Sequence, residues 1–155
     1  RAPDIIVDDG SHLWRDQQLT LARLFPVLKP GGIFVIEDVH TSCAIRLGCS
    51  FHNGSTIAML DRVAAGQGIT SEFMSKAQER HIGRWLEGAV RVVPPQRSAH
   101  MSQTAFLFKS REAGPGGTDP ADVTTRLGLA EGGFMRKHGA LHVVKRPAWF
   151  ANANA

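Results

Sequence analysis

Two short apolar runs, each ending in acidic residues, stand out in the first 40 positions of the chain. Residues 4–7 read DIIV and precede Asp8-Asp9, while residues 33–36 read IFVI and precede Glu37-Asp38. Short, continuous, β-branched runs of this kind are typical of strands buried on both faces of a parallel sheet. Both runs are therefore predicted to be buried strands.

The segment between the two runs has the period of a helix. Its apolar positions at i, i+3, i+4 and i+7 are Leu21, Leu24, Phe25 and Leu28. Pro26 must end or kink this helix, because proline cannot donate to the carbonyl four residues back. The KPGG sequence of residues 29–32 is then a strong stop, since glycine supplies the positive φ of a tight turn. Strand, helix and strand make a βαβ unit, whose right-handed crossover leaves the strands parallel.

Beyond residue 40 the same patterns predict two more helices and three more strands. The helices are expected at about residues 55–65 and 71–86, and the strands at 90–93, 104–108 and 141–144. Ser71 is the expected N-cap of the second helix, with Gly66 and Gly88 as the two stops. We expect an α/β fold in which residues 1–112 form a partial catalytic domain and residues 113–155 a loop-rich C-terminal extension.

Composition narrows the class of protein. The 155 residues include 43% hydrophobic and 21% charged positions, which fits one globular domain without a membrane span. The formal charge of +4 comes from scattered basic residues, so nucleic-acid binding is not expected. With Cys43 and Cys49 as its only cysteines and no signal-peptide layout at the start, the chain is expected to work in the cytoplasm.

The acidic pairs lie where an open parallel sheet binds its ligands, beyond the carboxyl ends of the strands. If the strands that end at Asp8-Asp9 and Glu37-Asp38 are neighbours, carboxylates from both meet within a few ångströms. A bound cation relieves the repulsion between them, and oxygen ligands favour a hard ion such as Mg²⁺. Because successive strand residues point to opposite faces, Glu37 and Asp38 can both reach one ion only if the backbone leaves the extended state there.

His12 follows Asp9 by three residues, just past a glycine, where a tight turn can return it over the strand end. Imidazole titrates near neutral pH, which suits a general base. A structural interpretation competes with this one: Asp9 or Ser11 could cap the next helix, with His12 as an exposed turn residue. A zinc site formed by His40, Cys43, Cys49 and His52 was also considered, but the spacing lacks the usual finger layout.

The runs IIVDDGSH and LFPVLKPGGIFVIEDVHTS resemble class I S-adenosylmethionine-dependent methyltransferases that O-methylate sugars of macrolides and related natural products. The resemblance implies a Rossmann-like sheet, mostly parallel with an antiparallel last strand. It also implies that Asp9, Glu37 and Asp38 hold Mg²⁺, that His12 is the base, and that Asp8 supports the strand end or the cofactor pocket. Gln17, His40 and Thr41 are expected to form a second layer of residues around the side chains that hold the ion.

Two features set this chain apart from the family pattern. Cys43-Ala44 stands where the family often has an aromatic pair. The Gly-rich turn and the ribose-binding acid of the first two βα units have no counterpart, so the chain is expected to be the C-terminal half of such a domain, with the first half missing. Alone, it is expected to bind S-adenosylmethionine weakly or not at all.

The resulting functional hypothesis is an O-methyltransferase that uses S-adenosylmethionine and Mg²⁺ to methylate a hydroxyl of a small molecule. Its sugar-modifying relatives are often multimeric, so a homo-oligomer is expected. Two alternatives stay open. One is a metal-dependent oxygenase using Asp9, His12 and Glu37, and the other is a non-catalytic subunit that completes its sheet with a partner chain.

Overall fold

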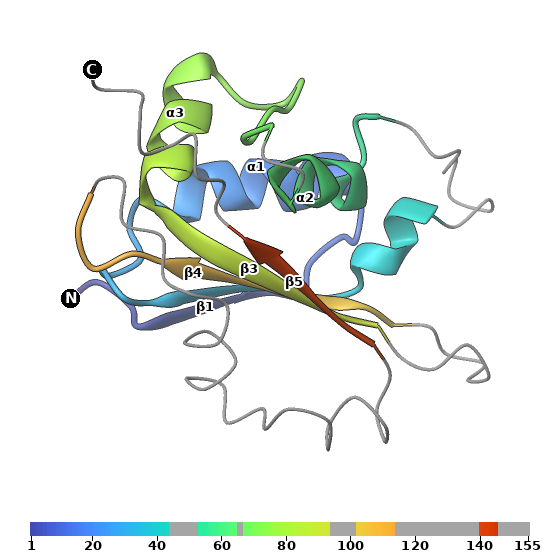
Figure 1. Cartoon of the computed structure of the whole chain (residues 1–155), viewed down its shortest axis with the longest axis horizontal. Coiled ribbons are helices and arrows are strands. Elements are labelled where there is room, and N and C mark those ends of the chain that lie inside the picture. The colour runs from blue at the N-terminus through green and yellow to red at the C-terminus, as the bar shows by residue number, and fades with distance from the viewer. Residues whose placement is uncertain (44–52, 65–66, 94–101, 114–139, 146–155) are drawn as a thin grey trace.

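In the computed structural model, the chain folds into one mixed sheet with helices packed on one face (Figure 1). The structure describes residues 1–43, 53–64, 67–93, 102–113 and 140–145. Within them the sheet has five strands in the order β1-β2-β4-β3-β5. The strands are β1 (Ile5–Asp8), β2 (Ile33–Ile36), β3 (Leu86–Val93), β4 (Thr104–Lys109) and β5 (Ala140–Lys145). The predicted α/β architecture is confirmed.

The strand directions divide the sheet into two parts. β1 and β2 are parallel, with Asp8 opposite Ile36, as the βαβ prediction requires. β4 is antiparallel to both β2 and β3, and β5 is antiparallel to β3. The expected antiparallel end of the sheet is therefore confirmed, while the parallel part described by the structure is confined to β1 and β2.

Helix α1 (Trp14–Leu24) crosses from β1 to β2 and supplies much of the core. Leu21, Phe25 and Leu28 are fully or almost fully buried, as their spacing predicts, whereas Leu24, expected on the same face, is 39% exposed. The turn after them depends on glycine. A Cβ on Gly32 would lie 2.8 Å from the carbonyl oxygen of Asp4, so a larger residue would push β2 away from β1.

The prediction that both strand runs are buried on two faces is right for β2 and wrong for β1. Phe34 and Ile36 of β2 are fully buried. In β1, Ile5 and Val7 are 59% and 55% exposed, and only the alternate residue Ile6 packs against the core. The reason is position: β1 is an edge strand, and α1, α2 and α3 lie on the opposite face of the sheet (Figure 1).

Both of the further helices expected from the sequence are present, but the second begins at Lys76 and not near residue 71. Helix α2 covers Thr56–Ala64, and the expected stop Gly66 lies outside the described residues. Helix α3 covers Lys76–Trp85, and its N-cap is Ser75, not Ser71. Ser75 forms a capping box with Gln78, so its hydroxyl accepts from the first turn while the glutamine accepts from the Ser75 N–H.

Strand β3 begins earlier than predicted. It starts at Leu86, directly after α3, so Gly88 lies inside the strand instead of ending the helix. The pairing of β3 with β4 shifts register between Leu86 and Gly88, which is where glycine commonly allows a local irregularity in a sheet. The sequence expectation placed the strand start at residue 90 because the apolar run becomes continuous there.

The strand expected at 141–144 is confirmed as β5, which pairs along β3 from Gly88 to Val93. The division of the chain at residue 112 stays a prediction, because most of the expected extension lies outside the described residues. None of the helices described has both the length and the apolar content needed to cross a bilayer.

A buried lysine, Lys109 at the end of β4, links that strand to the turn that follows α1. Lys109 is only 3% exposed, and its Nζ donates to the carbonyl oxygens of Phe25, Pro26 and Leu28 at 3.0, 2.9 and 2.6 Å. The ammonium also lies 5.5 Å from the Phe25 ring centroid and 5.4 Å from that of Trp85. Burial lowers the pKa of this lysine. Lys109 thus supplies an internal donor to carbonyls that follow the end of α1.

Replacing Lys109 by methionine is expected to destabilise the protein by at least ~2 kcal/mol, because the carbonyls of Pro26 and Leu28 lose their donor and that of Phe25 keeps only a long bond from the Leu28 N–H. The measurement is the free energy of unfolding from urea titration of the full-length protein. Lys29→Met is the matched control. Lys29 forms an ion pair with Asp4 at 2.6 Å, but that aspartate is 76% exposed, so a loss of under ~1 kcal/mol is expected. Equal losses in the two variants would contradict the role assigned to Lys109.

Candidate functional site

The loops that follow β1 and β2 meet at one edge of the sheet. The parallel ladder continues one step past the strands, where the Glu37 N–H donates to the carbonyl oxygen of Asp8 at 3.0 Å. A 3₁₀ helix, η1 (Val39–Cys43), then turns away from β2. Its first N–H, on Val39, donates to Gln103 just before β4 at 2.9 Å. The site is thus enclosed by three segments that are distant in sequence.

Two residues at this edge have a left-handed backbone. His12 has φ 59° and Asp38 has φ 52°, and they are the non-glycine residues with positive φ in the part of the chain that the structure describes. Aspartate and histidine are enriched among the few non-glycine residues that adopt this conformation. It takes Asp38 out of the extended state, which the sequence analysis set as the condition for its carboxylate to reach a shared ion.

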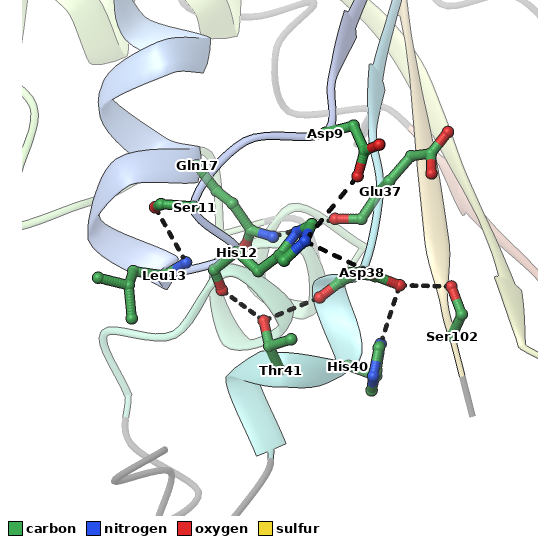
Figure 2. A network of polar contacts seen from close by, with 10 residues as sticks. All are labelled: Asp9, Ser11, His12, Leu13, Gln17, Glu37, Asp38, His40, Thr41 and Ser102. Atoms are coloured by element: carbon green, nitrogen blue, oxygen red, sulfur yellow. Dashed lines mark hydrogen bonds and ion pairs between the residues drawn. The ribbon is translucent and has the colours of Figure 1, made fainter. Parts of the chain in front are cut away.

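As a result, three side chains converge. His12 Nε2 lies 3.7 Å from Asp38 Oδ2 and 3.9 Å from Asp9 Oδ1 (Figure 2). One potential ligand atom from each of Asp9, His12 and Asp38 lies within 4.8 Å of the other two. The His12 side chain is 35% exposed, and it faces two carboxylates instead of standing free in solvent. Carboxylates following the two strands therefore do come together with the imidazole.

Glu37 does not lie in this group. Its carboxylate is directed away from His12 and Asp38 (Figure 2). The group that converges in the structure therefore contains two carboxylates and an imidazole, and not the three carboxylates that were expected as ligands. The alternation of side chains explains the difference. Glu37 still follows the strand, with its N–H bonded to Asp8 and its carbonyl accepting from Gln17 Nε2 at 3.1 Å, whereas Asp38 has turned.

The residues expected to form a second layer contact the backbone of this loop. Thr41 Oγ1 lies 2.5 Å from the carbonyl oxygen of His12 and 2.8 Å from that of Asp38. The Thr41 N–H already donates to the carbonyl oxygen of Asp38. We therefore assign the single hydroxyl proton of Thr41 to the hydrogen bond with the carbonyl oxygen of His12. Gln17, which is 2% exposed, holds the carbonyl of Glu37. Thr41 thus links the backbones of the two left-handed residues, His12 and Asp38.

Asp38 also has partners on its other oxygen. Ser102 Oγ donates to Asp38 Oδ1 at 2.5 Å, and His40 Nδ1 lies 3.5 Å from the same atom (Figure 2). The family resemblance implies a place for His40 near the site, whereas no pattern in the sequence points to Ser102. The signal that could have found it is the antiparallel pairing of β4 with β2, which brings the residues before β4 next to those after β2.

Asp8 is not part of the converging group. Burial raises the pKa of its carboxyl, while hydrogen bonds from the Gly10 backbone and the Thr20 side chain lower it. Its Oδ2 is buried and has no hydrogen-bond partner among the described residues. Asp8 and Asp9 therefore occupy different surroundings, as the sequence analysis expected.

The competing interpretation, that Asp9 or Ser11 satisfies free amides at the start of the helix, is not supported for Asp9 and is supported in part for Ser11. The N-cap of α1 is Leu13, and no side chain caps it. The Leu13 N–H donates to Ser11 Oγ at 3.3 Å, and the Ser11 hydroxyl donates to Asp16 at 2.6 Å, so Ser11 orders the start of the helix without involving Asp9. For the considered zinc site, Cys49 and His52 lie outside the described residues.

The donor set fits a hard divalent cation. Asp9 and Asp38 offer carboxylate oxygens, the ligands that Mg²⁺ prefers, and the Asp9 side chain is 62% exposed, which leaves it free to adjust. An imidazole nitrogen is a less suitable ligand for such an ion. His12 is therefore better placed to exchange a proton with a molecule bound between the carboxylates than to bind the ion itself.

Comparison with known proteins confirms the resemblance noted in the sequence. The chain is 49% identical over 117 residues to 8-demethyl-8-alpha-L-rhamnosyl tetracenomycin-C 2'-O-methyltransferase of Streptomyces olivaceus, a match covering 74% of this chain. It is 49% identical over 39 residues to mycinamicin VI 2''-O-methyltransferase of Micromonospora griseorubida, covering 25% of this chain and 10% of that protein. The matched region spans 29% of the length of the tetracenomycin relative. No protein-family model matches the chain.

Among solved structures, the chain is similar to MycE methyltransferase from the mycinamycin biosynthetic pathway in complex with Mg, SAH and mycinamycin VI. The TM-score is 0.46 with 27% sequence identity, and the match covers 70% of this chain and 26% of that one. A second crystal form, with Mg and SAH, matches with a TM-score of 0.46 and 26% identity over 84% of this chain.

The left-handed backbone of Asp38 gives a test that does not depend on any ligand. Alanine normally stabilises a protein relative to glycine, but at positive φ its Cβ costs about 1 kcal/mol. We therefore expect Asp38→Gly to be more stable than Asp38→Ala by about 1 kcal/mol, measured by thermal unfolding in the presence of a chelator. Both variants lose the same carboxylate, so the comparison isolates the backbone. An alanine variant as stable as the glycine variant would exclude the left-handed conformation.

Proposed function

We propose that this chain is part of a Mg²⁺-assisted, S-adenosylmethionine-dependent O-methyltransferase that acts on a hydroxyl of a sugar attached to a natural product. The observation that carries the proposal is the convergence of Asp9, His12 and Asp38 at the carboxyl edge of two parallel strands. The similarity to sugar O-methyltransferases supports the reaction class.

In this proposal Asp9 and Asp38 hold the cation. Glu37 would join them only after rotation of its side chain, because its carboxylate points elsewhere in this structure. A bound Mg²⁺ would supply positive charge that lowers the pKa of an acceptor hydroxyl. The two aspartates thereby also fix where that hydroxyl lies, which removes much of the entropic cost of bringing the reactants together.

His12 is the proposed general base. Its Nε2 faces the space between the two carboxylates, so a hydroxyl held there lies within reach of an acceptor for its proton. The bond from Thr41 to the His12 carbonyl keeps the residue in its left-handed conformation and so maintains that orientation. The methyl group comes from S-adenosylmethionine.

Asp8 is proposed to face the cofactor pocket. Its Oδ2 is buried without a hydrogen-bond partner among the described residues, and a buried carboxylate oxygen in that state is an acceptor that a ligand hydroxyl or amine can satisfy. We further propose that the protein works in the cytoplasm and forms homo-oligomers, as expected from its two cysteines and from its sugar-modifying relatives.

The second candidate is a metal-dependent oxygenase that uses iron, with Asp38 in the place expected for Glu37 beside Asp9 and His12. Two carboxylates and one imidazole match the facial triad of non-haem iron enzymes in ligand number, although with the ligand types reversed. Iron-dependent oxygen uptake in the absence of S-adenosylmethionine, with no methyl transfer when it is present, would favour this candidate over the methyltransferase.

The first test concerns the base. In the full-length protein, His12→Ala is expected to reduce methyl transfer to a glycosylated acceptor by about 10²-fold or more, because general-base catalysis contributes on that order. The affinity for S-adenosylmethionine, measured by calorimetric titration, is expected to stay within about twofold because His12 faces the acceptor. His81→Ala is the control, since His81 lies beside Trp85 on α3, away from the site. A His12 variant that turns over normally would remove the residue from the mechanism.

A second test ranks the carboxylates. Asp38→Asn is expected to weaken Mg²⁺ binding more than tenfold, because it removes a charge that lies within the converging group. Glu37→Gln is expected to weaken it less, because that side chain has to rotate before it can bind. The measurement is the cation dependence of the rate, together with direct Mn²⁺ titration. The reverse order would show that Glu37, and not Asp38, is the principal ligand.

A further inference from the structure

We propose that Ser102 is a positioning residue for the cation site, because its hydroxyl fixes the Asp38 carboxylate with one oxygen turned toward Asp9 and His12. This inference rests on the proposed function, since it concerns the same cation. It adds a residue from the antiparallel side of the sheet, 64 positions away from Asp38 in the sequence.

The two oxygens of Asp38 have different surroundings. Oδ1 accepts from Ser102 at 2.5 Å, whereas Oδ2 faces His12 Nε2 at 3.7 Å (Figure 2). His40 Nδ1 also lies near Oδ1, but at 3.5 Å it is at the limit of a hydrogen bond. The serine hydroxyl is therefore the group that determines which oxygen is left for a ligand.

The backbone places Ser102 at this position. β4 runs antiparallel to β2, with Ala105 opposite Ile36, so the residues before β4 lie beside those that follow β2. The residues that follow Asp38 and Ser102 are also bonded to each other, because the Val39 N–H donates to the Gln103 carbonyl oxygen at 2.9 Å. Val39 itself is fully buried, which anchors this contact in the core.

A carboxylate with no such donor would lose its orientation. The last torsion of an aspartate side chain has a broad, roughly two-fold preference, so neighbouring groups determine its orientation. Ser102 is the nearest of these groups to the Asp38 carboxylate at 2.5 Å, against 3.5 Å for His40 and 3.7 Å for His12. Outer-shell partners of metal-binding carboxylates typically change metal affinity by 10–100-fold when they are removed.

The test measures cation affinity in the full-length protein without substrate, using Mn²⁺ titration followed by electron paramagnetic resonance. Ser102→Ala is expected to raise the Kd for Mn²⁺ about tenfold, and Ser102→Thr, which keeps the hydroxyl, to stay within about twofold of the unmodified protein. In turnover assays the alanine variant is expected to need more Mg²⁺ for half-maximal rate, while the rate at saturating Mg²⁺ changes little.

Ser110→Ala provides the matched control. Ser110 follows the other end of β4, and its hydroxyl donates to backbone carbonyls, those of Trp85 and Glu112. This variant is expected to lower the thermal midpoint without changing the Kd for Mn²⁺, so a general loss of stability can be told apart from a loss of positioning.

The outcomes separate this inference from the proposed function. If the unmodified protein binds no divalent cation, both are overturned. If it binds Mn²⁺, and Asp38→Asn loses that binding while Ser102→Ala keeps the original Kd, the cation site stands and the role of Ser102 is wrong. A threonine variant as weak as the alanine variant would also contradict it, because the hydroxyl would then be irrelevant.

Discussion

The parallel hydrogen bonding of β1 to β2 ends at the same level on both strands. Asp8 lies opposite Ile36, and the next N–H along, that of Glu37, still donates to the carbonyl of Asp8. This shared end brings two acidic loops to one edge, because parallel strands present their carboxyl ends on the same side of a sheet. A shift of one residue in the register would reverse which side chains of β2 face the core, and Phe34 and Ile36 are fully buried. The packing of the core thus also fixes the geometry of the site.

The site stores backbone strain in two places, and the surrounding structure holds it there. His12 and Asp38 both adopt positive φ, a conformation that costs of order 1–3 kcal/mol for a residue other than glycine. Hydrogen bonds from Thr41 and Gln17 to the loop carbonyls offset part of that cost. The extended alternatives would leave successive side chains pointing to opposite faces. The strained backbone at Asp38 therefore allows its carboxylate, which follows β2, to reach His12, which follows β1.

Much of this arrangement follows from sequence patterns, and the exceptions have specific causes. Apolar runs and helical spacing located β1, β2 and α1, and the alternation rule indicated that Glu37 and Asp38 would differ unless the backbone turned. Ile5 and Val7 are exposed because β1 lies at the edge of the sheet formed by the described residues, and an apolar run alone does not tell an edge strand from a central one. Ser71 was preferred to Ser75 as a cap, although only Ser75 has a glutamine three residues later, which completes a capping box. Ser102 could not be found without the pairing of β4 with β2, because no local pattern links residues 64 positions apart.

That separation along the chain sets an order in which the site is assembled. The βαβ unit that carries Asp9, His12 and Asp38 is made from residues close in sequence, so it can form soon after it leaves the ribosome. The serine that orients Asp38 is synthesised later, and the loop between them must close before it contributes. Until β4 joins the sheet, the Asp38 carboxylate lacks its hydrogen bond from Ser102. If Asp38 holds a cation as proposed, full affinity for that cation requires β4 to be in place in the sheet.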